Sequence, residues 1–69
     1  MTARERDALI ALGWPQLGEE VLVSHFRHRA WVLLGGAHSV TVVMMEGRAV
    51  GSKTAWPKRA LWPVEVDGG

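Results

Sequence analysis

Three apolar runs separated by short links restrict this 69-residue chain to a mainly β fold. Residues 21–26 (VLVSHF), 30–34 (AWVLL) and 40–45 (VTVVMM) are rich in the β-branched and aromatic side chains that pleated strands favour. The link GGAH (35–38) precedes the third run and EGR (46–48) follows it. Both links are typical of hairpin turns, so we expect neighbouring antiparallel strands and a weaker fourth strand around residues 48–54.

The N-terminus has the pattern of a short helix. Thr2 and Glu5 match a capping box, in which the two side chains satisfy free backbone N–H groups, and Gly13 stands where a left-handed cap ends a helix. We therefore predict a helix over residues 3–12 that packs on the strands, because a helix of this length is not stable alone in water. Trp14-Pro15 opens an extended linker. The apolar residues of the predicted helix are Ala8, Leu9, Ile10, Ala11 and Leu12.

The stretch WPKRALWPVEV (56–66) contains two Trp-Pro pairs with a basic pair between them. Pro57 suits the first position of a single helical turn, and Pro63 permits only an edge strand over residues 64–66. This order, after a first strand opened by GEEVLV (18–23), resembles the SH3-like small barrel of the Tudor and KOW kind, in which a short 3₁₀ turn commonly precedes the last strand. The resemblance covers about residues 18–66 and implies a barrel, with the helix plugging one open end or mediating association.

The predicted architecture is thus one mainly β domain over residues 1–69. A helix (3–12) and a linker (13–19) precede an SH3-like five-stranded barrel (20–66) and a short tail (67–69). The chain has no cysteine, which excludes disulfides and thiolate zinc sites, and with 48% hydrophobic residues it is too apolar for a disordered chain. No apolar run approaches the roughly 20 residues of a membrane span, so we expect a cytoplasmic protein with no membrane partner.

The sequence gives little support for cofactor or catalytic chemistry. The segment GRAVGSKT (47–54) lacks P-loop spacing, because its second Gly comes one place early. His25 and His28 would point to opposite faces of a strand beside repelling arginines, which argues against a metal site. Ser24-His25 and His38-Ser39 likewise place nucleophile and base on opposite faces. We expect no cofactor, no metal and no catalytic residues; an enzyme would need an active site shared across an oligomer.

The charge of the chain is unevenly distributed although its net charge is only +1. Residues 24–63 hold six basic residues against one acidic residue, a local charge of +5, whereas the flanks hold two basic against six acidic residues, a charge of −4. A basic middle segment favours an anionic partner. The candidate surface for nucleic acid or another partner comprises Arg27, His28, Arg29, Arg48, Lys53, Trp56, Lys58, Arg59 and Trp62.

The four tryptophans divide into structural and binding candidates. We predict that Trp31, in a central strand, lies in the core and that Trp14 pins the helix to the strands. Trp56 and Trp62 bracket the basic pair and offer rings for stacking on bases or on a protein, although at least one of them is expected to be buried.

Two of the predicted strands are apolar on both faces, whereas a solvated strand alternates with polar residues. One short helix covers only part of such a surface, so we expect a homo-oligomer. The preferred function is a small non-enzymatic nucleic-acid-binding or regulatory protein. The alternative is a protein-interaction module, such as a subunit or inhibitor of a larger protein, of the kind that phages and plasmids encode.

Overall fold

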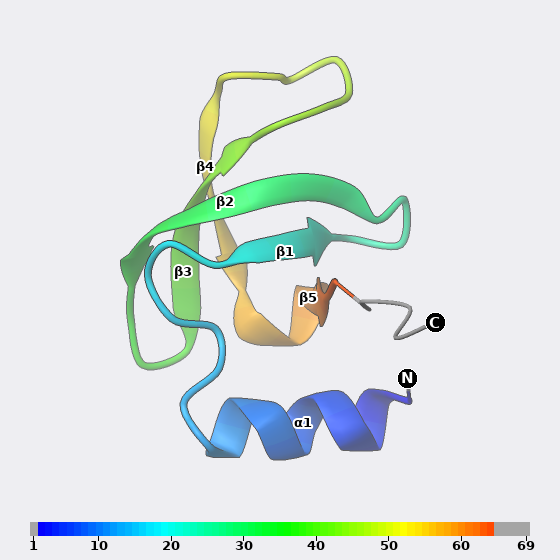
Figure 1. Cartoon of the computed structure of the whole chain (residues 1–69), viewed down its shortest axis with the longest axis vertical. Helices are drawn as coiled ribbons and strands as arrows, with labels where there is room; N and C mark the ends of the chain where they lie inside the picture. The colour runs from blue at the N-terminus through cyan, green and yellow to red at the C-terminus, as the bar shows by residue number, and fades with distance from the viewer. Residues whose placement is uncertain (1, 65–69) are drawn as a thin grey trace.

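The structure is a computed structural model that describes residues 2–64. It is mainly β, with one short N-terminal helix (Figure 1). The elements in chain order are α1 (Ala3–Ala11), β1 (Glu20–Val23), β2 (His28–Gly35), β3 (Ser39–Met44), β4 (Lys53–Pro57), the 3₁₀ turn η1 (Lys58–Ala60) and β5 (Leu61–Pro63).

The five strands form one antiparallel sheet in the order β4-β3-β2-β1-β5. The sheet curls strongly, and η1 carries the chain from the β4 edge to the β5 edge (Figure 1). The five predicted strands are present, but within the described residues they do not close into a barrel, because β4 and β5 do not pair with each other. β5 has only three residues and ends in Pro63, which has no backbone N–H to donate to a further strand.

The first strand is shorter than predicted because the chain reverses after Val23. Ser24 and Arg27 take left-handed φ values of 60° and 56°, which end the extended conformation. The backbone N–H of Phe26 donates to Oγ of Ser24 over 3.3 Å and tightens this turn. Residues 24–27 therefore form the β1–β2 turn, and β2 begins at His28.

The last two strands are also displaced from their predicted positions. The predicted fourth strand (48–54) is mostly a turn bounded by Gly47 and Gly51, at φ 85° and 84°, and β4 begins at Lys53. The final strand was expected at residues 64–66 but lies at Leu61–Pro63, directly after η1. Residues 65–66 of that expectation lie outside the described part of the chain.

The core lies on the concave face of the sheet and consists of small aliphatic side chains. Every second residue of β1 and β3 points inward and is buried. Trp14 and Trp56 pack against this core at its margin. The buried hydrophobic residues are Val21, Val23, Ala30, Val32, Val40, Val42, Met44 and Leu61.

Helix α1 lies across the end of the sheet next to η1 (Figure 1). It begins as predicted, with Thr2 as N-cap accepting a hydrogen bond of 3.2 Å from the Glu5 backbone, and Gly13 follows it at φ 101°. Its most buried residue is Arg6, whereas Leu12 is 84% exposed. The expected apolar packing face is therefore only partly correct, since Leu9 and Ile10 alone among its apolar residues are half-buried.

The composition of the core predicts that two leucines contribute very differently to the free energy of unfolding. Leu61→Ala removes a fully buried side chain and should lower the free energy of unfolding by about 2–4 kcal/mol, a large fraction of the stability of a small domain. Leu12→Ala, the same change at an exposed position, should shift it by less than about 0.5 kcal/mol. Urea unfolding followed by circular dichroism measures both; similar losses would contradict this assignment of the core.

Candidate functional site

The nine residues predicted to form one binding surface lie in several places. Arg29 and Lys53 are exposed on the convex face of the sheet, and Arg48 is exposed in the β3–β4 loop. Lys58 and Arg59 lie in η1. The remaining four, Arg27, His28, Trp56 and Trp62, each contact other parts of the protein.

Trp56 points toward the core rather than outward. Its register partner is the buried Val40, and the ring packs against the core cluster. The indole Nε1–H donates a hydrogen bond of 2.8 Å to Oγ1 of Thr54 on the same strand. Because both the ring and its polar atom have partners within the protein, Trp56 is held as part of the sheet and does not present an open ring to a base.

Trp62 is held by two arginines. The guanidinium carbon of Arg6 lies 4.4 Å from the centroid of the Trp62 ring, and that of Arg27 lies 4.8 Å away. Both distances are within the range of cation–π contacts. Arg6 also donates from Nε and Nη2 to Oδ1 of Asp7, each over 3.3 Å. This contact joins α1, the β1–β2 turn and β5, which are far apart in the sequence.

His28 lies on the core side of β2, beside the β3–β4 loop. A Cβ placed on Gly47 would come within 2.8 Å of its Nδ1, so the imidazole fills the space that a glycine leaves open. Its ring also stacks on that of Phe26, with 5.8 Å between centroids. His28 therefore packs against this loop rather than joining the arginines on either side of it.

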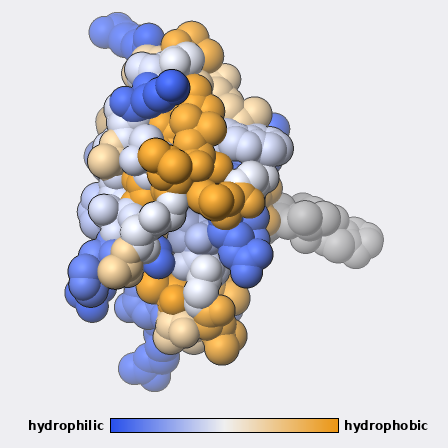
Figure 2. Space-filling view, turned by 90° about the vertical axis from the view of Figure 1, so that its left-hand side faces the viewer, coloured by the Kyte–Doolittle hydropathy of each residue, from blue (hydrophilic) through white to orange (hydrophobic). Residues whose placement is uncertain are grey.

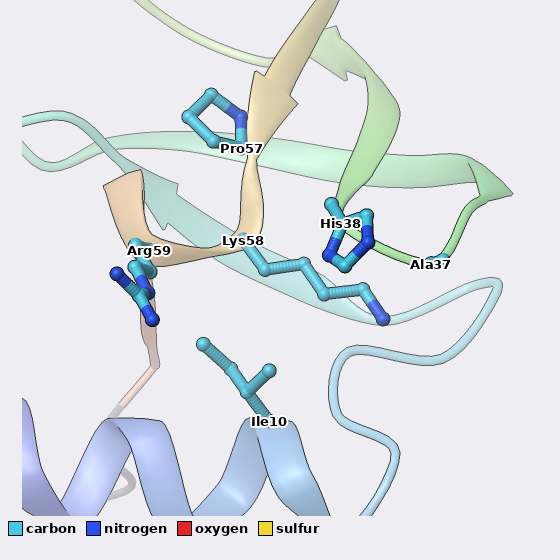
Figure 3. A pocket seen from close by; sticks show the side chains of 6 residues that line it. All are labelled: Ile10, Ala37, His38, Pro57, Lys58 and Arg59. Carbon is cyan, nitrogen blue, oxygen red and sulfur yellow. The ribbon is translucent and has the colours of Figure 1, made fainter.

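A cavity of about 350 Å³ opens between α1 and η1. Figure 3 shows Ile10 pointing from α1 toward η1, while Lys58 extends toward the β2–β3 turn and Arg59 is directed toward α1. The backbone N–H of Lys58 donates to the carbonyl of His38 over 3.0 Å and ties η1 to this turn. The lining residues are Ile10, Ala37, His38, Pro57, Lys58 and Arg59.

The part of the cavity lining that the structure describes includes two cationic side chains and an imidazole, but no carboxylate. Among residues 2–64, no carboxylate lies within ion-pair distance of Lys58 or Arg59. Its chemistry therefore suits an anionic group beside an apolar wall. The sequence pointed to Lys58 and Arg59 but not to His38 or Ile10, because only the folding of the hairpin and the docking of α1 bring these two to η1.

Trp31 is exposed on the convex face, and the prediction that it lies in the core is wrong. Its neighbours Ala30 and Val32 point inward and are buried, so the alternation of β2 turns the indole outward with 42% of its surface exposed. The same face carries Lys53, Val43 and Glu20 in register with Trp31.

The described part of the chain contains neither a cluster of metal-binding side chains nor a membrane-spanning helix. Within residues 2–64, no three His, Asp or Glu side chains converge in a way that could hold a metal ion. His38 lies in the β2–β3 turn, whereas His25 lies in the β1–β2 turn and His28 is the first residue of β2. In the same range, no helix is long and apolar enough to cross a membrane.

The chain matches no protein-family model, no curated protein and no solved structure. Its fold and surfaces define a small mainly β protein with a basic cavity at one end and an apolar convex face.

The contact between Arg6 and Trp62 should stabilise the docked helix. Arg6→Met keeps much of the apolar stem but removes the charge, and it should lower the free energy of unfolding by about 1 kcal/mol. In a Trp62→Leu background the same change should cost much less, giving a coupling of about 1 kcal/mol in a double-mutant cycle. The control is Arg4→Met on the exposed side of α1, expected within about 0.5 kcal/mol of the parent. Equal effects at Arg6 and Arg4, or no coupling, would contradict this role.

Proposed function

We propose that this protein binds nucleic acid, without catalysing a reaction, through basic groups at the junction of α1 and η1. The observation that carries the proposal is the cavity whose lining includes His38, Lys58 and Arg59 and, among residues 2–64, no carboxylate. Cationic side chains with free donors bind phosphate oxygens, which dominate the affinity of proteins for nucleic acids. We call these three residues together with Arg27 the basic junction.

Arg27 extends the basic surface beyond the cavity. Arg6 and Ile10 are four residues apart and thus lie on the same face of α1, one turn from each other. Ile10 lines the cavity, whereas Arg6 contacts the Trp62 ring on which Arg27 also lies. Through the Trp62 ring, the exposed Arg27 is thus linked to the face of α1 that also lines the cavity, which supports a basic track that extends beyond the cavity.

The environment of the tryptophans favours recognition of the backbone over recognition of bases. Trp56 packs against the core, and Trp62 is already in contact with two guanidinium groups. Because neither ring is free to stack on a base, the basic junction contacts mainly phosphates. Phosphates carry no sequence information. The protein should therefore bind many sequences similarly and release them as salt rises.

We further infer that the open sheet is a variant of the SH3-like small barrel. The support is the order of its elements, in which five antiparallel strands follow a helix and a 3₁₀ turn stands directly before the last strand. Small barrels of this type serve many unrelated functions, so this inference adds nothing to the argument for nucleic acid.

A fluorescence titration of a labelled oligonucleotide at several salt concentrations tests the function. With single-stranded DNA, we expect the affinity to fall with salt at a slope of about −0.7 for each phosphate neutralised. Lys58→Ala/Arg59→Ala should weaken binding at low salt and make the slope shallower by about 1–1.5, as expected when two phosphate contacts are lost.

The matched control is Arg4→Ala/Arg48→Ala, which removes two exposed positive charges outside the cavity lining. This control has the same net charge as the Lys58→Ala/Arg59→Ala variant. It should keep most of the parent's affinity for DNA and most of the parent's salt dependence. Equal effects of the two pairs would mean diffuse attraction without a site, and no binding of the parent at low salt would overturn the proposal.

Protein recognition is a second candidate function, and a separate observation favours it. The convex sheet surface carries Leu22, Trp31, Leu34, Val43 and Met45, which we call the outer apolar face. Leu34 is 64% exposed and Met45 43%. Figure 2, which views the left-hand side of Figure 1, shows a band of apolar side chains on the side where β3 and the end of β2 lie. An exposed surface of this kind marks contacts with proteins.

A further inference from the structure

We propose that the outer apolar face joins two copies of this chain, packed face to face about a two-fold axis that runs along the strands. This interface is separate from the basic junction. The partner that binds the outer apolar face is thus a second copy of the same chain. The register of the sheet supports this choice of partner.

Four residues form a row across the outer apolar face. Val43 of β3 pairs with Lys53 of β4 on one side and with Trp31 of β2 on the other, and Trp31 pairs with Glu20 of β1. Neighbouring strands are about 4.8 Å apart, so the row spans about 14 Å from Lys53 to Glu20. A basic residue thus stands at one end, an acidic residue at the other, and two large apolar side chains lie between them.

This order makes the row complementary to itself. A two-fold axis parallel to the strands, passing between Val43 and Trp31, reverses the row in the second copy. Lys53 of each copy then lies opposite Glu20 of the other, and Trp31 lies opposite Val43. A two-fold axis along the row would instead place Lys53 against Lys53 and Glu20 against Glu20, so the charges select the first arrangement.

The rows on either side fit the same axis. Arg29 is the register neighbour of Met45, whose backbone N–H donates to the Arg29 carbonyl over 2.9 Å, so each Arg29 stem would cover Met45 of the second copy. Leu34 pairs with Thr41 and would face Thr41 of the second copy. No like charges meet in these rows, and two sheets packed in this way are about 10 Å apart, a distance that their side chains fill.

The charges also argue against other occupants of this face. Nucleic acid requires a surface of one sign, whereas this row ends in Glu20 at one side. Oε1 of Glu20 lies 4.0 Å from Nη1 of Arg29 in the same chain. The Glu20 side chain is still 27% exposed, which leaves it accessible to a lysine of the second copy. Helix α1 packs at η1 and reaches only the β5 margin of this face, where Arg6 lies on Trp62, the register partner of Leu22.

Sedimentation equilibrium of charge-reversed variants tests the interface. Each dimer contains two Lys53–Glu20 pairs, so Lys53→Glu or Glu20→Lys alone converts two attractions into two repulsions and should weaken association about tenfold or more. The double variant restores both pairs with opposite polarity and should return close to the parent affinity. A mixture of the two single variants should form heterodimers in preference to either homodimer.

Three outcomes would overturn the inference: a parent protein that stays monomeric at all concentrations, a double variant no better than the single ones, or a mixture without preferential heterodimers. The first outcome would leave the face to a different protein. Arg59→Glu is the control charge reversal, because it lies in the basic junction and should leave dimerisation unchanged while weakening nucleic-acid binding. Dimerisation and nucleic-acid binding can therefore fail independently of each other.

Discussion

A core of small aliphatic side chains on one face of a single curved sheet is the constraint on which the rest of this structure depends. Valines dominate the buried set, and Leu61 and Met44 are its largest members. Such a core has little room for an indole, and none of the four tryptophans is fully buried. The rings lie at the margin, where Trp14 and Trp56 close the edge of the core, Trp62 meets α1, and Trp31 faces outward.

The position of α1 follows from this arrangement. The helix has no broad apolar stripe, and it reaches the sheet through Arg6, which is buried against the Trp62 ring, and through the half-buried Leu9 and Ile10. Docking at the end of the sheet leaves Trp31 and Leu34 of the convex face exposed and encloses a cavity beside η1. One contact between an arginine and an aromatic ring thus helps to separate the basic surface from the apolar one.

The existence and order of the elements could be predicted from the sequence, because they depend on local signals. The capping pair at Thr2 and Glu5, the β-branched runs and Pro57 before a helical turn act over a few residues, and the structure contains the corresponding elements. The sequence-based predictions were wrong where packing between distant parts of the chain decides which side chains are buried. Trp31 looked like a core residue because it is large, but the pleat assigns the inward positions to the smaller Ala30 and Val32.

The cavity has a consequence for the folding equilibrium of the helix. Ile10 belongs to α1, whereas every other lining residue belongs to the sheet, its β2–β3 turn or η1, so the complete cavity exists only while the helix is docked. Any molecule that binds only the complete cavity adds its binding free energy to docking by mass action. Occupancy and helix docking are then thermodynamically linked, and the backbone amides of α1 would exchange with solvent more slowly whenever the cavity is filled.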